Sequence, residues 1–281
     1  MPAPRAVAMG GEPRHSVVEL RSSGYELPCE LWEPPSVAKP EVALVLCHGA
    51  TQKGMRHELI RHLASRLSYR WPVLAFDLPG FGRAPRLVIR GPDDYLYYAH
   101  ALAAAERAEE LTGLKAVLVG HSMGGRVSLQ AAARGGGDLV AGVITIAGLY
   151  DFPSSPSEML RLVEDFVSFV RVKLEVPVEE LARDIAERRV MEKAIRALRV
   201  PLLAVEAGRE HYAFIRNSRY GLFKAARCPK TLVLLGKADH KFKEHHEAVA
   251  NVIADWLEHY LGSPAIWPRG KTRGNADRRL A

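Results

Sequence analysis

The sequence predicts an α/β domain in which a mostly parallel β-sheet is covered by helices on both faces. From residue 41 onward, short and nearly pure apolar segments alternate with helical stretches. Strands that are apolar throughout are typical of a parallel sheet buried on both sides. With 281 residues, 48% of them hydrophobic, the chain can bury one large core, so we expect a single domain.

The predicted parallel strands are six apolar segments, at residues 42–47, 72–76, 116–119, 143–147, 201–205 and 232–235. An antiparallel pair precedes them, because residues 25–31 alternate between apolar and polar positions and residues 16–20 offer a partner. Pro28 lacks the N–H that a neighbouring strand would need. We therefore expect the strand that contains Pro28 at an edge of the sheet.

Between the fourth and fifth parallel strands lies an insertion, residues 152–199. Pro156 suits the first position of a helix, and Pro177 separates this helix from a second one that starts near residue 178. An apolar stripe that begins at Met159 suggests a small helical cap that packs on the sheet and lines an acyl pocket. The domain with its cap covers residues 1–262.

Charge and targeting signals argue for a protein of the cytoplasm that binds small molecules. The N-terminus lacks the apolar run of a secretory signal, and no segment is apolar for the length of a membrane span. Three cysteines are too few for a disulfide framework, which favours a reducing compartment. The formal charge is +7, but residues 263–281 hold five basic residues against one aspartate. We expect a basic, disordered tail there and no nucleic-acid partner.

The segment Gly120-His121-Ser122-Met123-Gly124-Gly125 stands between a predicted strand and a predicted helix. A serine on such a sharp turn needs small neighbours, so that the backbone can fold tightly and expose the hydroxyl group. Ser122 is therefore the candidate nucleophile.

A serine needs a base to take its proton, and the base needs a carboxylate to hold it in the right tautomer. His240 follows the strand at 232–235, and Glu210 follows the strand at 201–205. Because loops after parallel strands leave the same edge of the sheet, these side chains can converge on Ser122. Asp151, after the strand at 143–147, is the alternative acid.

The developing oxyanion needs backbone N–H donors. Met123 N–H, at the start of a helix, is one natural donor. We expect the second to be Ala50 N–H, in the loop that follows the strand at 42–47.

Four motifs in order make the chain resemble the α/β-hydrolase family: His48-Gly49, Asp77-Leu78-Pro79-Gly80-Phe81-Gly82, the segment around Ser122, and Ala238-Asp239-His240. The resemblance covers about residues 16–261. It implies an eight-stranded sheet, a triad in the order serine, acid, histidine, and hydrolysis through an acyl-enzyme. The Ala238-Asp239-His240 segment is most similar to small serine esterases and peptidase-like hydrolases. The family usually has aspartate at the acid position, where this chain offers Glu210.

The predicted function is therefore a serine hydrolase, carboxylesterase-like, that cleaves the ester of a small acyl substrate. The same triad could serve a thioesterase, a peptidase or amidase, or an acyltransferase. A hypothesis from another class is a non-catalytic hydrolase fold that binds a ligand or a partner protein. The sequence predicts no cofactor and no metal, since it has neither a phosphate-binding loop nor metal-ligand spacing. It leaves the oligomeric state open.

Overall fold

The computed structural model describes residues 11–36 and 38–261 and contains one eight-stranded sheet. Its strands lie in the order β1 (Arg14–Ser22), β2 (Tyr25–Glu33), β4 (Val73–Phe76), β3 (Ala43–Cys47), β6 (Ala116–His121), β7 (Val140–Ile146), β9 (Leu202–Ala207) and β10 (Lys230–Leu235). Only β2 is antiparallel to its neighbours; from β4 to β10 every pair is parallel. This arrangement confirms the predicted fold class.

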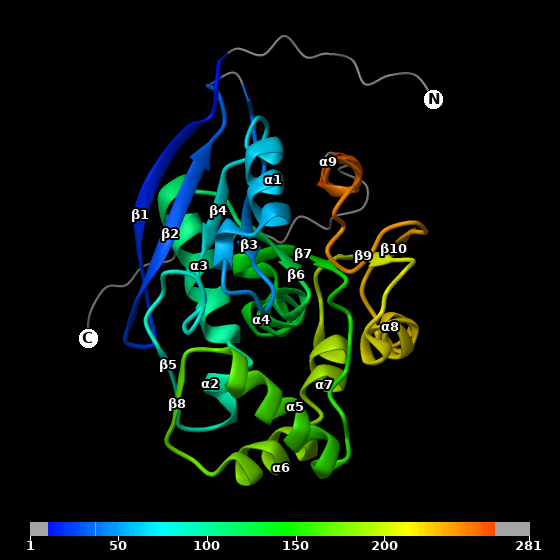
Figure 1. Cartoon of the computed structure of the whole chain (residues 1–281). Helices are drawn as coiled ribbons and strands as arrows, with labels where there is room; N and C mark the ends of the chain where they lie inside the picture. Colours follow the sequence, from blue (N-terminus) through cyan, green and yellow to red (C-terminus); the bar gives the residue numbers. More distant parts are fainter. Residues whose placement is uncertain (1–10, 37, 262–281) are drawn as a thin grey trace, which may run out of the picture.

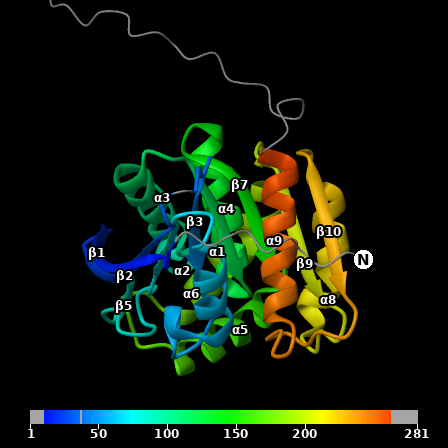
Figure 2. The ribbon, with the colours of Figure 1, turned by 90° about the horizontal axis from the view of Figure 1, so that it is seen from above.

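Helices cover both faces of the sheet (Figures 1 and 2). One face carries α1 (Glu58–Leu67), which follows the short 3₁₀ helix η1 (Gly54–Arg56), and α9 (His246–Leu261). The other face carries α3 (Tyr98–Thr112), α4 (Met123–Leu139) and α8 (Ala213–Ala225). Each face has its own apolar cluster, with Leu63 and Trp256 in one and Val127 and Ala104 in the other. The sheet is therefore the middle of three layers. The loops that follow its strands lie at the edges of the sheet, where they can carry functional side chains.

The prediction that Pro28 marks an edge strand is wrong. β2 lies between β1 and β4, and β1 forms the edge. β4 pairs with β2 only from Cys29 onward, so the missing N–H of Pro28 falls just outside that ladder. The Pro28 carbonyl, which proline retains, accepts a hydrogen bond from Asp77 N–H at 2.9 Å.

The segment 152–199 contains α5 (Pro156–Phe169), β8 (Val172–Leu174), α6 (Val178–Arg188) and α7 (Val190–Ala197). β8 forms a small parallel sheet with β5 (Leu87–Ile89), which precedes α2 (Pro92–Leu96). Beside β8, the Arg171 guanidinium donates to the carbonyls of Gly80, Phe81, Gly82 and Ala84. The segment is thus tied to the loop after β4. The pairing of β5 with β8 could not be predicted from the sequence, because strands of three residues are too short to show a periodic pattern.

None of the helices in residues 11–36 and 38–261 has the length and apolar character that crossing a membrane requires. The predicted tail, residues 263–281, lies outside the described residues.

Candidate functional site

Ser122 stands on a strained turn between β6 and α4, with φ 52° and ψ −121°. A residue with a side chain pays about 1–3 kcal/mol for such a backbone. Only glycine fits at the flanking positions: a Cβ on Gly120 would lie 2.1 Å from the Gly124 carbonyl oxygen, and a Cβ on Gly124 would lie 2.2 Å from that of Cys47. The turn is held by Ser122 N–H, which donates to the Ile146 carbonyl at 2.9 Å. The serine hydroxyl is thereby presented at the carboxyl edge of the sheet.

The side chains of Ser122, His240 and Glu210 form a continuous hydrogen-bonded chain. Ser122 Oγ lies 3.0 Å from His240 Nε2, and His240 Nδ1 lies 2.7 Å from Glu210 Oε2. Because a carboxylate accepts, the Nδ1 atom carries the proton, which leaves Nε2 free to accept from the hydroxyl group. The His240 side chain is 8% exposed and that of Glu210 is fully buried.

Of the two candidate acids, the structure brings Glu210 and not Asp151 to His240. Asp151 is half-buried and forms local hydrogen bonds. Its Oδ1 accepts from Phe152 N–H at 2.9 Å, and its backbone N–H donates to Ser218 Oγ at 3.2 Å. Glu210 is also held from behind, since Tyr212 N–H donates to Oε1 at 2.9 Å.

Electrostatics keep Glu210 ionised. Burial raises the pKa of this carboxyl group, but hydrogen bonds from His240 and from Tyr212 N–H outweigh burial, so the net shift of the pKa is downward. A charged carboxylate is what an imidazolium needs beside it when the base takes a proton.

The loop that carries Ala50 is oriented by His48. His48 Nδ1–H donates to the Gly49 carbonyl at 2.7 Å, and His48 Nε2 accepts from Leu78 N–H at 2.9 Å. The Gly49 carbonyl and Ala50 N–H share one planar peptide, so fixing the carbonyl also fixes the direction of the N–H. Burial lowers the pKa of His48, which keeps the ring neutral in this role. Neither Ala50 N–H nor Met123 N–H donates a hydrogen bond within the described part of the chain.

His121, the residue before Ser122, supports the loop of the base. Its Nε2–H donates to the His240 backbone carbonyl at 2.9 Å, and burial lowers the pKa of His121 to about 3. A neutral ring therefore links the turn at Ser122 to the loop at His240. In the sequence, His121 is visible only as part of a motif, and no signal there points to this task.

A sequence model described as the alpha/beta hydrolase family matches residues 44–272. The chain belongs to the alpha/beta hydrolase family. Structures of the family give the same result for the fold: an esterase domain of a Rhodothermus marinus protein has a TM-score of 0.65 at 22% identity, covering 89% of this chain and 100% of its own. Est1E from Butyrivibrio proteoclasticus has a TM-score of 0.65 at 17% identity, covering 88% and 99%.

Relatives by sequence include an esterase, a lipase and a synthase, all at low identity. Pimeloyl-[acyl-carrier protein] methyl ester esterase of Neisseria meningitidis is 26% identical over 248 residues, 75% of this chain and 76% of the relative. Monoglyceride lipase of Homo sapiens is 28% identical over 133 residues, 46% of this chain and 42% of the lipase. The chain likewise spans only 46% of 2-succinyl-6-hydroxy-2,4-cyclohexadiene-1-carboxylate synthase of Serratia proteamaculans, at 32% identity.

A second buried carboxyl group, Glu206, lies on β9 just before the loop of Glu210. Both of its oxygens lack a hydrogen-bond partner among the described residues. Burial raises the pKa of Glu206 from 4.5 to about 8, and the Arg219 guanidinium opposes this only in part. The sequence held a signal for it, since a glutamate stands inside an otherwise apolar strand.

We expect Glu206 to make stability fall as pH rises from about 4.5 to about 8. In that window the folded protein holds one more proton than the unfolded chain, so the free energy of unfolding drops by up to about 1.4 kcal/mol per pH unit. Glu206→Gln should gain stability relative to wild type across this window, measured by urea unfolding, whereas exposed Glu244→Gln should not. Parallel pH curves for Glu206→Gln and wild type would refute the prediction.

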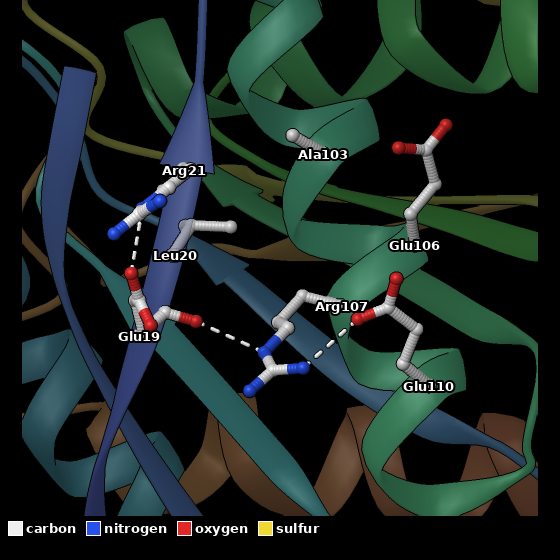
Figure 3. Close-up of a pocket in the computed structure, with 7 residues that line it drawn as sticks. All are labelled: Glu19, Leu20, Arg21, Ala103, Glu106, Arg107 and Glu110. Atoms are coloured by element: carbon white, nitrogen blue, oxygen red, sulfur yellow. Dashed lines mark hydrogen bonds and ion pairs between the residues drawn. The ribbon is translucent and has the colours of Figure 1, made fainter. Parts of the chain in front are cut away.

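A hollow between β1 and α3 is unrelated to Ser122 (Figure 3). Its lining is mostly charged: Arg21 pairs with Glu19 at 2.6 Å, and Arg107 donates to the Glu19 carbonyl and to Glu110. Within residues 11–36 and 38–261, no three His, Cys, Asp or Glu side chains gather as metal ligands would.

Proposed function

We propose that the protein is a serine hydrolase that cleaves a carboxylic ester through an acyl-enzyme on Ser122. The hydrogen-bonded chain from Ser122 through His240 to the ionised Glu210 carries the proposal. A surface serine and histidine meet by chance far more easily than a strained serine, a histidine and a fully buried carboxylate do together.

In this mechanism His240 Nε2 takes the Ser122 proton as Oγ attacks the acyl carbon. Met123 N–H and Ala50 N–H donate to the resulting oxyanion, each worth about 3–4 kcal/mol. His240 then protonates the departing alcohol, and water activated by the same ring releases the acid. Glu210 holds the ring in its tautomer and stabilises its charged form.

Esters are favoured over thioesters and amides because one relative is named a methyl ester esterase and another is named a lipase. The cytoplasmic location and the small-molecule substrate stay predictions from the sequence. All three cysteines are free, as a reducing compartment would require.

Labelling with a fluorophosphonate probe tests the activated serine without knowledge of the substrate. We expect the wild-type protein to form a covalent adduct that peptide mapping locates on Ser122, and Ser122→Ala to remain unlabelled. Folded wild-type protein that does not react would favour the non-catalytic alternative, and an adduct on another serine would refute the assignment.

A further inference from the structure

Arg126 is a buried cation without an anion. It lies on α4, one helical turn after Ser122, and only 2% of it is exposed. Its Nε and Nη1 atoms have no hydrogen-bond partner, and no carboxylate lies within ion-pairing distance, among residues 11–36 and 38–261. Arg171, by contrast, donates to four carbonyl groups.

Two aromatic rings enclose the guanidinium at the edge of the sheet where Ser122 lies. The guanidinium carbon is 4.3 Å from the centre of the Phe152 ring and 5.7 Å from that of Tyr95. Phe152 follows the loop after β7, and Tyr95 packs at 4.9 Å against Phe166 of α5. The charge therefore sits between α4 and the segment 152–199. Ring faces attract a cation but accept none of its five N–H donors in the plane of the group.

This environment suits a carboxylate that arrives with a ligand. Burial of an unpaired charge is unfavourable, and a cation near the N-terminus of a helix is unfavourable too, so a neutral side chain of the same length would be more stable at this position. The planar fork of arginine matches the two oxygens of a carboxylate.

We propose that Arg126 binds a carboxylate at the far end of the acyl group, so that the substrate is a monoester of a dicarboxylic acid. This proposal rests on the proposed function for its assignment of the acyl side. The alcohol must leave beside His240 Nε2, which protonates it, and that ring is bordered by Tyr212 at 4.7 Å and His211 at 5.7 Å. Arg126 instead contacts Phe152 and Tyr95, so it faces the other part of the substrate.

Binding is tested first, in a background that needs no catalysis. With Ser122→Ala protein, we expect adipate to bind in calorimetry and to raise the melting temperature, and hexanoate, of equal length but with one carboxylate, to bind at least about 30-fold more weakly. Adding Arg126→Met should remove this preference, and adding Arg126→Lys should weaken adipate binding about tenfold, because the charge stays but the fork is lost. Equal binding of adipate with and without Arg126→Met would overturn the subsite whatever the fate of the triad.

Turnover is tested second, with the 4-nitrophenyl monoester of adipic acid against 4-nitrophenyl hexanoate. The ratio of the two kcat/KM values should fall at least about 30-fold in Arg126→Met. Arg134→Met is the matched control, since Arg134 lies on the same helix over the Tyr98 ring, two turns farther from Ser122, and its ratio should stay that of wild type. A preference for a carboxylate on the alcohol instead of the acyl group would overturn the proposal, and so would no preference at all. Failure of the wild-type protein to react with the fluorophosphonate probe would refute the proposed triad but not the binding of a carboxylate by Arg126.

Discussion

Ser122→Ala should reduce turnover of 4-nitrophenyl esters by at least about 10⁴-fold while the protein stays folded. Oγ is the attacking atom in the proposed mechanism, and alanine offers no other nucleophile at the turn. The backbone of Ser122 has φ 52°, and alanine accepts this conformation no better and no worse than serine, so the melting temperature should change little. Steady-state kinetics and a thermal melt on the same sample provide both measurements.

A glycine variant gives the control for the backbone. Ser122→Gly also lacks the hydroxyl group, but glycine adopts a positive φ without strain, so this variant should be as inactive as Ser122→Ala and more stable by about 1 kcal/mol. Activity within tenfold of wild type in either variant would remove Ser122 from the mechanism.

Glu210→Gln should lower kcat by about 10⁴-fold, and Asp151→Asn should lower it by less than about tenfold. An amide at position 210 can donate to His240 Nδ1, which favours the tautomer that carries its proton on Nε2 and cannot accept from Ser122 Oγ. Among the residues that the structure describes, the Asp151 carboxylate accepts from Phe152 N–H, and asparagine can do the same through its carbonyl oxygen. Both replacements change a carboxylate into the corresponding amide, so a difference in their effects reports the position of the residue and not the chemistry of the change.

Glu210→Asp separates charge from reach. Aspartate keeps the charge of the carboxylate but is one methylene shorter than the side chain that lies 2.7 Å from His240 Nδ1. It should therefore retain part, but not all, of the activity that glutamine loses. If Asp151→Asn were the more damaging change, the role of the acid would pass to Asp151, and Ser122 and His240 would keep theirs.

The sequence predicted the strands and helices in which apolar residues recur at regular intervals. It also predicted the candidate site residues that directly follow the ends of strands. Because parallel strands end at one edge, Ser122, His240 and Glu210 could be placed together from the order of the strands alone. For the acid, the sequence favoured Glu210 and kept Asp151 as the alternative, since the geometry that separates them depends on the path of two loops. The pairing of β5 with β8 was missed because three residues carry no periodicity.

The roles of His121 and Arg126 could not be predicted from the sequence, because they depend on contacts in space. The hydrogen bond from His121 to the His240 carbonyl joins residues 119 positions apart. The isolation of Arg126 is a property of what surrounds it in space, and an arginine in a helix is ordinarily a surface residue. Asp77, which belongs to one of the four motifs, organises its loop by accepting hydrogen bonds from Met55 N–H and Arg83 N–H.

The segment 152–199 leaves from β7, returns to β9, and is fastened between these ends, where β8 pairs with β5 and Arg171 donates to the loop after β4. A segment that is fastened in its middle as well as at both ends cannot swing open about its ends as a hinged lid does. Entry to Ser122 would then depend on the rotation of single side chains such as the exposed Phe169 and Tyr212, which takes nanoseconds or less. Solvent viscosity should accordingly leave kcat unchanged.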